Sequence, residues 1–260
     1  MDLASAALLI ALDEYPSLDI QKYLREFESM AAVLRCDIDF PIKTRSLEAI
    51  ERLSRFLFHT RGFRGNTEDY YDPRNSYLNE VLERRLGIPI TLSLVFIEVG
   101  RRLGLRIEGV GMPGHFIVKC LHNGLEVFVD PFNRGEILTE GECRKRLESQ
   151  HESGFEFHRS FLDTVSKRQI LTRMLANLKG IYLQRQEFRK ALGAIEKRIL
   201  INPQLHSEIR DRAAVHFKLN NLSSALADWG RYLEMQPGAA DAEEVKAQMN
   251  IAGQLLALRN

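Results

Sequence analysis

The sequence predicts an α+β fold in which N-terminal helices and a small antiparallel sheet are followed by an all-α segment of helical repeats. The first observation is a nearly all-apolar run, Ile90 to Val99, which is typical of a helix buried on all sides. The second is a pair of strand-like segments joined by Asn123-Gly124, the strongest short signal for a hairpin. The third is a 34-residue period in the last third of the chain.

The length and composition are those of an ordinary globular protein. The 260 residues allow one large domain or two small ones, and we expect two, residues 1–165 and residues 166–260. Hydrophobic residues make up 45% of the chain and charged residues 27%. A formal net charge of +1 carries no signature of nucleic-acid or membrane binding, so we expect neither as a partner.

The N-terminal stretch, residues 3–12, is the one apolar run that resembles a targeting signal. It is too short to span a bilayer. Asp2 stands where a signal peptide needs basic residues, and Asp13-Glu14 follow the run directly. We expect a packed first helix, and a cytoplasmic location follows by default.

Two amphipathic helices come next. Ser17 or Asp19 can cap the first, residues 20–34, and Ser46 opens the second. Cys36 lies in the link between them, where we expect a small buried hydrophobic residue rather than a displaced nucleophile. The side chains predicted to be buried are Tyr23, Phe27, Met30 and Leu34 in the first helix, and Leu47, Ile50, Leu53, Leu57 and Phe58 in the second.

A loop rich in Gly, Asn, Asp and Pro, residues 61–76, leads into the predicted core. Loops carry function more often than the elements they join, so this loop either lines a cleft or crosses the surface. Asn75 or Ser76 then caps a helix at residues 77–86, which Gly87 terminates.

The buried helix begins at Pro89, because the N–H that proline lacks has no partner at the first position of a helix. Arg101, Arg102 and Gly104 suit its C-terminal end. Residues 105–110 follow and alternate like a strand with one solvated face.

The hairpin places a histidine and a carboxylate on one face of the sheet. We expect strands at residues 115–121 and 125–130. If Asn123-Gly124 form the turn, positions that sum to 247 face each other, and His115 lies two residues from the partner of Asp130; if the turn is one residue earlier, the two are direct partners. Either register puts the two side chains on one face, whereas a three-residue loop would not, and we predict contact between His115 and Asp130. Such a pair is either a general base with its orienting carboxylate or a structural contact.

After the hairpin we expect a short strand at residues 137–138 and a helix from its cap, Thr139, to about Leu147, with Cys143 packed inside. Residues 150–160 form a polar connector, and its His151 and His158 have no carboxylate partner in a helical pattern. The three cysteines are widely spaced, and no CxxC, HExxH, GxGxxG or P-loop motif occurs. We therefore expect no disulfide framework, no metal site and no cofactor.

The 34-residue period resembles that of tetratricopeptide repeats. Small Ala residues let two helices approach, larger side chains fill the gap, and Pro ends the second helix. We expect two repeats, residues 172–202 and 206–236, and a capping helix at residues 240–258. The segment then binds a protein or peptide partner or simply buttresses the core. The matched positions are Leu175 and Ile209, Tyr182 and His216, Ala191 and Ala225, Ile195 and Trp229, and Pro203 and Pro237.

The core resembles the transglutaminase-like (papain-like) cysteine enzymes, in which a buried helix precedes a strand with His and a strand that ends in Asp-Pro. The closer resemblance is to the bacterial SirB-one-type family, a transglutaminase-like core followed by tetratricopeptide repeats. Four phrases carry it: Tyr77-Leu-Asn-Glu-Val-Leu, Gly87-Ile-Pro-Ile, Pro113-Gly-His115-Phe and Asp130-Pro-Phe-Asn133.

The resemblance also reveals a missing residue. In the transglutaminase pattern the nucleophilic Cys starts the buried helix about seven residues before an aromatic, and counting back from Phe96 leads to Pro89. The resemblance therefore implies a vestigial site in which His115 and Asp130 remain without their thiol. The other residues that it places around the cleft are Asn79, Thr91, Ser93, Gly114 and Asn133.

Two function classes follow. The first, favoured by Pro89, is a non-catalytic protein-interaction module, a pseudoenzyme with a bacterial regulatory or accessory role. The second is a cysteine-protease-like or transglutaminase-like amide hydrolase or acyl transferase, with His115 as general base and Asp130 as its orienting residue. Its nucleophile is unidentified: a hydroxyl such as Ser93 or Thr91, or a thiol from elsewhere. The sequence does not decide the oligomeric state.

Overall fold

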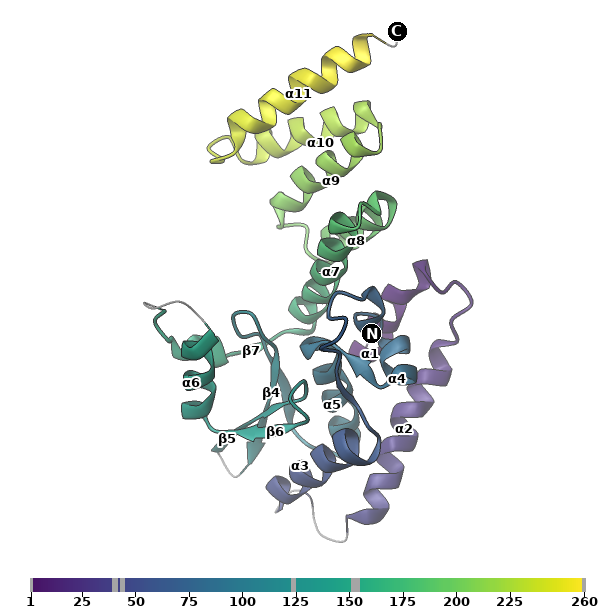
Figure 1. Ribbon diagram of the computed structural model, residues 1–260, viewed down its shortest axis with the longest axis vertical. Helices are drawn as coiled ribbons and strands as arrows, with labels where there is room; N and C mark the ends of the chain where they lie inside the picture. Colours follow the sequence, from purple (N-terminus) through teal and green to yellow (C-terminus); the bar gives the residue numbers. More distant parts are fainter. Residues whose placement is uncertain (1, 39–41, 43–44, 123–124, 151–154, 259–260) are drawn as a thin grey trace. The chain divides into compact units, whose positions relative to one another are not determined.

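The computed structural model describes residues 2–38, 42, 45–122, 125–150 and 155–258 (Figure 1). The chain divides into two compact units, Met1–Ile170 and Leu171–Asn260. The first unit holds helices and a small antiparallel sheet, and the elements of the second are helices. The predicted α+β class with an all-α C-terminal segment is confirmed.

The first unit begins with helices that have acidic caps. Asp2 accepts a hydrogen bond from Ser5 N, and Asp19 accepts one from Lys22 N. Each carboxylate thereby satisfies a backbone donor that the first turn of a helix leaves free. The elements are α1 (Leu3–Ile10) with the 3₁₀ turn η1 (Ala11–Asp13), α2 (Ile20–Asp37), and α3 (Ser46–Arg55) with the π-helical turn η2 (Phe56–Thr60).

Two predictions for these helices are wrong. Because α2 continues to Asp37, Cys36 lies in its last turn and is exposed instead of buried in a link. Leu47 is half-buried because it lines an open pocket beside α3. The other residues predicted to be buried in α2, α3 and η2 are buried.

The loop at residues 61–76 contains elements that the sequence did not predict. Its strand β1 (Arg64–Gly65) pairs in parallel with β2 (Leu86–Gly87). The 3₁₀ turn η3 (Pro73–Asn75) then leads to α4 (Leu78–Arg84).

The ends of α4 also differ from the prediction. Its N-cap is Tyr77, with no side-chain hydrogen bond, and not Asn75 or Ser76. Arg85, with φ of 61°, takes the left-handed position that we predicted for Gly87. The helix ends early because Leu86 and Gly87, which follow Arg85, pair with β1 as strand β2.

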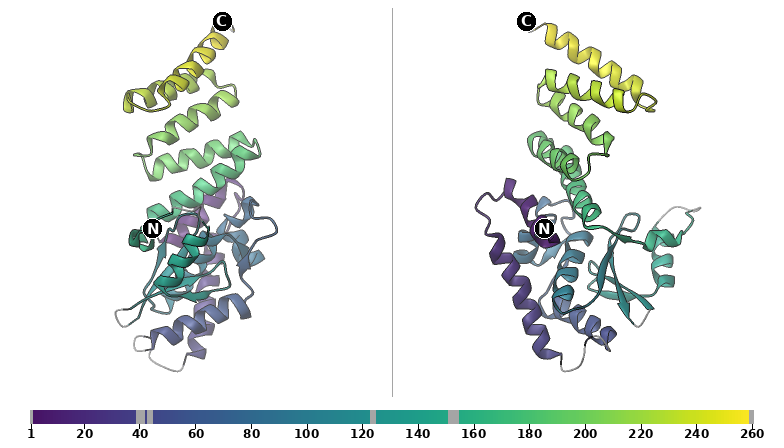
Figure 2. Two further views of the ribbon diagram at one scale, coloured as in Figure 1. Left: turned by 60° about the vertical axis from the view of Figure 1, so that its left-hand side comes forward. Right: turned by 180° about the vertical axis from the view of Figure 1, so that it is seen from behind.

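The central helix of the first unit is α5 (Pro89–Arg102), as predicted. Every residue from Pro89 to Gly100 is buried. Burial extends around the whole helix because α2 lies on one side of α5 and the sheet lies on the other (Figures 1 and 2).

The five-stranded sheet has the order β6-β5-β4-β3-β7, and its neighbouring strands are antiparallel. The pairs between β4 and β5, such as Val118 with Val129, sum to 247. This is the register predicted for a turn at residues 123–124, which themselves lie outside the described residues. The strands are β3 (Ile107–Val110), β4 (Ile117–His122), β5 (Leu125–Asp130), β6 (Glu136–Leu138) and β7 (Thr164–Val165).

Some strand boundaries differ from the prediction. β3 begins two residues later than predicted, and the two-residue β7 was not predicted. His115 lies in the turn before β4 and not on the strand, because Gly114 has a φ of 69° and His115 N donates a hydrogen bond to Met112 O at 3.2 Å.

The sheet face away from α5 is covered by α6 (Glu140–Gln150) and the 3₁₀ turn η4 (Arg159–Leu162) (Figure 1). Thr139 caps α6 as predicted: its N–H donates to Glu142 Oε2 at 2.7 Å, and its Oγ accepts from Glu142 N at 3.3 Å. Cys143 is buried against the sheet, also as predicted. Of the two connector histidines, His151 lies outside the described residues.

The second unit consists of packed helices with the predicted 34-residue equivalences. Ala191 and Ala225 are both fully buried, and so are Ile195 and Trp229. The last helix adds Val245 to the core that contains Trp229, as a capping helix should. Within the described residues, no helix combines the length and the apolar character needed to cross a membrane. The helices are α7 (Lys167–Gln184, which begins in the first unit), α8 (Phe188–Ile201), α9 (His206–Lys218), α10 (Leu222–Met235) and α11 (Ala242–Ala257).

Candidate functional site

A buried histidine and a buried aspartate meet at the end of the β4–β5 hairpin. His115 Nε2 lies 2.8 Å from Asp130 Oδ2, and the two side chains are 10% and 0% exposed. The predicted contact is confirmed. Because an ionised carboxylate only accepts hydrogen bonds, Nε2 carries the proton and Nδ1 is the basic nitrogen of the neutral ring.

Asp130 is the centre of a network of hydrogen bonds. Its Oδ1 accepts from Phe132 N at 3.1 Å and from Asn133 N at 3.2 Å, and its Oδ2 accepts from Asn133 Nδ2 at 2.8 Å. Burial opposes ionisation of Asp130, but the hydrogen bond and electrostatic interaction with His115 and the hydrogen bonds of Asn133 outweigh burial and lower the pKa of this carboxyl. Asp130 is therefore ionised at neutral pH.

A cation that the sequence analysis missed also binds Asp130. Arg146 of α6 places NH1 2.5 Å from Asp130 Oδ2 and NH2 2.7 Å from Glu136 Oε2. The guanidinium offsets the negative charge of the Asp130 carboxylate. The carboxylate therefore stabilises a protonated His115 less strongly than it would alone. The local sequence does not distinguish Arg146 from Arg144, which is 60% exposed and pairs with Glu148. Only the packing of α6 on the sheet selects Arg146.

The turn after Asp130 packs against α3 and η2. Gly135 has φ of 72°, and its N–H donates to Asp130 O at 2.8 Å. Ser54 Oγ donates to Gly135 O at 2.7 Å. A Cβ on Gly135 would lie 2.1 Å from Ser54 Oγ and 2.3 Å from the Phe58 ring, so only glycine permits this approach.

An aromatic ring that contacts the histidine also lines a pocket. The Phe132 ring packs edge-on against the His115 imidazole, with centroids 6.2 Å apart, and against Tyr70 at 6.0 Å. Phe132 and Asn133 also line a pocket of about 500 Å³. Residues 64–68 form another part of its lining, which favours the cleft-lining alternative for the 61–76 loop.

The start of α5 holds three of the predicted site residues. Pro89 is its first residue and is buried. Thr91 Oγ accepts from Ile88 N at 3.1 Å and donates to Asn75 O at 2.7 Å, so this hydroxyl caps the helix. Ser93 is fully buried, and its Oγ lies 3.5 Å from Phe116 O.

The other predicted cleft residues occupy different environments. Asn133 contacts Asp130 through both its backbone and its amide. Asn79 is 2% exposed on α4, and its Oδ1 has no hydrogen-bond partner in the described part of the chain. Gly114 is exposed in the turn that leads to His115. Of these three residues, Asn133 has a direct hydrogen bond to the pair.

The two buried cysteines lie where a thiolate is disfavoured. Burial raises the pKa of the Cys120 thiol to about 12 and that of the Cys143 thiol to about 12. An activated thiol instead needs a pKa lowered by neighbouring cations or a helix N-terminus. Cys36 is exposed at the end of α2.

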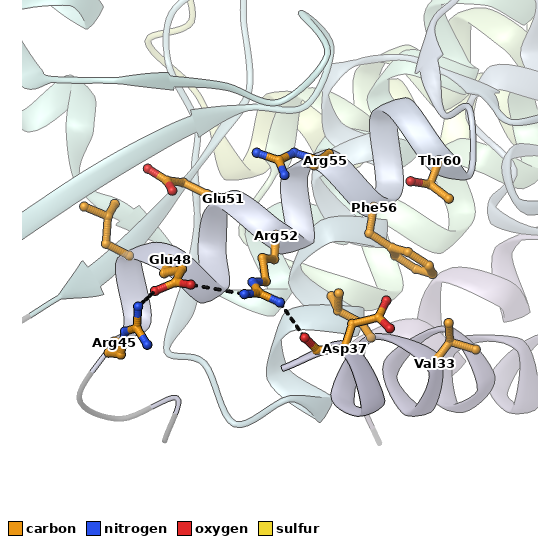
Figure 3. A pocket seen from close by; sticks show the side chains of 11 residues that line it. Val33, Asp37, Arg45, Glu48, Glu51, Arg52, Arg55, Phe56 and Thr60 are labelled. Atoms are coloured by element: carbon orange, nitrogen blue, oxygen red, sulfur yellow. Dashed lines mark hydrogen bonds and ion pairs between the residues drawn. The ribbon is translucent and has the colours of Figure 1, made fainter. Parts of the chain in front are cut away.

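A larger pocket of about 1060 Å³ lies between α2 and α3 (Figure 3). Three of its charged side chains interact: Arg52 binds Glu48 at 3.2 Å, and Arg45 pairs with Glu48. Arg52 also donates to the Asp37 carbonyl at 2.5 Å. None of the predicted site residues that the structure describes lines it. Among the same residues, no group of His, Cys, Asp and Glu side chains could hold a metal ion. The candidate site is therefore the His115–Asp130 pair.

The chain is similar to known proteins along most of its length. Residues 21–176 match the transglutaminase-like superfamily, and residues 178–250 match the tetratricopeptide repeat. A UPF0162 protein of Xylella fastidiosa (strain Temecula1) is 36% identical over 256 residues, which cover 96% of this chain and 89% of that protein. A UPF0162 protein of Vibrio cholerae is 29% identical over 201 residues, which cover 77% of this chain and 74% of that protein.

A eukaryotic protein shares a shorter region. F-box only protein 21 of Mus musculus is 33% identical over 142 residues, which cover 52% of this chain and 22% of that protein. No solved structure matches the chain. The two bacterial relatives therefore share a larger part of this chain than the eukaryotic protein does.

Proposed function

Because the chain belongs to the transglutaminase-like superfamily and to the UPF0162 family, we propose that it is a non-catalytic protein-interaction module of the SirB-one type. In this proposal residues 1–165 form a degenerate transglutaminase-like domain, and residues 166–260 form a repeat domain that binds a protein or peptide. The proposal includes a regulatory or accessory role in the bacterial cytoplasm.

The observation that carries this proposal is Pro89 at the first position of α5. The family resemblance puts the nucleophilic thiol at this position. Proline offers no nucleophilic atom, and it lacks the N–H that could stabilise an oxyanion. Two of the three parts needed for acyl transfer are then missing, while the base and its carboxylate remain.

The surroundings of the pair add support. The hydroxyl of Thr91 is occupied in capping α5, and burial raises the pKa of two of the thiols. The ion pair of Asp130 with Arg146 suits a structural role, because its charge is already compensated. The match of residues 178–250 to tetratricopeptide repeats supports partner binding by the second domain, because such arrays commonly present extended binding surfaces.

One observation favours the second candidate function, an amide hydrolase or acyl transferase. His115 and Asp130 keep the 2.8 Å contact that a general base and its orienting carboxylate need. In that reading Nδ1 of His115 accepts a proton from a nucleophile that is still unidentified.

The deciding experiment is an assay of amide hydrolysis, ester hydrolysis and amine incorporation over a broad substrate panel. We expect the wild-type protein to show no turnover above the uncatalysed background. Turnover that disappears in both His115→Ala and Asp130→Ala, but not in Glu108→Ala on the neighbouring strand β3, would favour the enzyme. All three variants must first be shown to fold by circular dichroism.

A further inference from the structure

The second unit contains a small pocket lined by residues of α9, α10 and α11, with a volume of about 300 Å³. Ala214, Trp229 and Val245 provide its apolar part. Trp229 is 0% exposed and Val245 is 4% exposed, so these walls are well packed. The volume is at the lower limit for small-molecule sites and suits a single side chain of a partner.

The arginine beside this pocket is held in place by two carboxylates. Arg210 NH1 lies 2.5 Å from Asp241 Oδ2, and Arg210 NH2 lies 2.8 Å from Asp211 Oδ1. Tyr232 OH donates to the other oxygen of Asp241 at 2.8 Å. Arg210 is therefore neutralised and immobilised.

The ion pairs continue away from the pocket in a balanced network. Lys179 Nζ lies 2.8 Å from carboxylate oxygens of both Glu208 and Asp211, and Arg198 NH2 lies 2.7 Å from Glu208. With the pair of Arg210 and Asp241 included, the network contains three cations and three carboxylates. They are Lys179, Arg198 and Arg210, and Glu208, Asp211 and Asp241. The network leaves no net charge to attract a ligand.

Glu244 is the exception. It lines the same pocket from the first turn of α11, and it is exposed. It makes no ion pair with any residue in the described part of the chain. The uncompensated charge at the pocket is thus the single negative charge of Glu244.

We propose that this pocket binds one lysine or arginine side chain of a peptide partner. The aliphatic stem lies on the half-buried Ala214, above the floor that Trp229 and Val245 close, and the cation reaches Glu244. Long basic side chains commonly bury their stems while their charge stays near water. This inference rests on the proposed function, in which the repeat domain binds a peptide. It adds the chemistry of the residue that is recognised.

The charge of the whole second unit restricts the rest of the peptide. Residues 171–260 contain 13 Lys and Arg and 9 Asp and Glu, a net charge of +4. A polybasic segment would be repelled by this field, whereas an acidic or neutral segment would not. The partner is therefore a neutral or acidic segment with a single basic residue at the pocket.

Trp229 makes the proposal directly measurable, because it is the one tryptophan of the chain and its fluorescence reports on the pocket. A library of random nine-residue peptides is selected on the full-length protein. We expect the selected peptides to share one Lys or Arg, to have no excess of positive charge, and to change the Trp229 emission. Replacing that residue by norleucine, which keeps the stem and removes the charge, should weaken binding about tenfold or more.

The matched variants are Glu244→Gln and Glu243→Gln. Both carboxylates lie in the first turn of α11 and interact similarly with the helix dipole. Glu243 has an 88% exposed side chain and pairs with Lys246, outside the pocket. We expect Glu244→Gln to weaken binding about tenfold and Glu243→Gln to leave it unchanged.

The outcomes separate this inference from the function on which it rests. Selected peptides without a basic residue, or with equal affinity for Glu244→Gln and the wild type, overturn the assignment of the pocket and leave peptide binding standing. Failure to select any peptide contradicts the proposed function itself, and it also overturns the assignment of the pocket.

Discussion

Asp130 is the residue on which the candidate site depends. It is fully buried, its pKa is lowered, and His115, Asn133 and Arg146 all bind its carboxylate. A buried carboxylate with this many donors is costly to disturb, because each donor loses a charge-assisted hydrogen bond when it is removed. The network is therefore expected to contribute to stability whether or not the protein has an activity.

We expect Asp130→Ala to lower the free energy of unfolding by about 1–3 kcal/mol at neutral pH. Folding lowers the pKa of Asp130 from 3.8. The ionised carboxylate therefore stabilises the folded state above pH 3.8, and this stabilisation is lost as the pH falls through the pKa of Asp130 in the folded protein. Urea denaturation of both proteins between pH 7 and pH 3 measures this. A difference in stability that stays constant or grows in acid would contradict the assignment.

Arg146 and Arg144 form a matched pair of substitutions on α6. Arg146→Gln leaves Asp130 and Glu136 without their shared cation and is expected to destabilise the fold by about 1–3 kcal/mol. Arg144→Gln removes only an exposed pair with Glu148, and we expect a change within about 0.5 kcal/mol. Equal effects of the two substitutions in urea denaturation would show that the contact with Asp130 contributes nothing.

Among the elements, the start of α5 is where the transglutaminase pattern would place its nucleophilic Cys. Pro89 is buried at the first helical position, where its ring is preorganised for the helix. A thiol placed there would have to occupy space packed around a ring. The element is therefore expected to accept the substitution poorly or without regaining an active nucleophile.

Pro89→Cys in a Cys36→Ser background tests this expectation. We predict slow alkylation of the new thiol at pH 7, no dependence of its rate on His115→Ala, and no hydrolase activity. Mass spectrometry after timed exposure to iodoacetamide gives the rate. Fast labelling that His115→Ala abolishes would reveal an intact thiol–imidazole site, because only an activated thiolate behaves in that way.

The turn from Asp130 to Gly135 is the element that positions Asn133. Gly135→Ala introduces a Cβ 2.1 Å from Ser54 Oγ at φ of 72°, whereas Gly104→Ala has φ of 87° with nothing within 4 Å. Both substitutions lower stability because alanine disfavours a positive φ, and Gly135→Ala adds a clash with a buried side chain. We expect Gly135→Ala to be the more destabilising by about 1–3 kcal/mol in thermal and urea unfolding. A smaller cost than that of Gly104→Ala would mean that the turn is loosely held.

For the whole molecule, the two compact units suggest two unfolding transitions. Each has a hydrophobic core of its own, one around Phe128 and Cys143 and one around Trp229. Gly135→Ala should lower the transition of the first unit in far-ultraviolet circular dichroism and leave the midpoint of Trp229 fluorescence unchanged. A parallel shift of both signals would show that the units unfold as one.

The patterns that predicted this fold correctly are local and periodic. The apolar run of α5 indicated a buried helix, and the Asn-Gly signal in the sequence predicted the register of β4 and β5, near whose ends His115 and Asp130 meet. The 34-residue period located the repeat helices. These features could be predicted because side-chain periodicity and turn chemistry depend on near neighbours in the chain.

The features that could not be predicted depend on packing between distant segments. Arg146 reaches Asp130 only because α6 lies on the sheet in one orientation, and Arg85 takes the left-handed position because β2 must pair with β1. Cys36 is exposed because α2 extends past its last buried residue. Among the described residues Glu244 makes no ion pair, because Arg210, which lines the same pocket, binds Asp211 and Asp241 instead. Charge pairing and close approach are set by which surfaces meet in three dimensions, and a one-dimensional pattern does not contain that information.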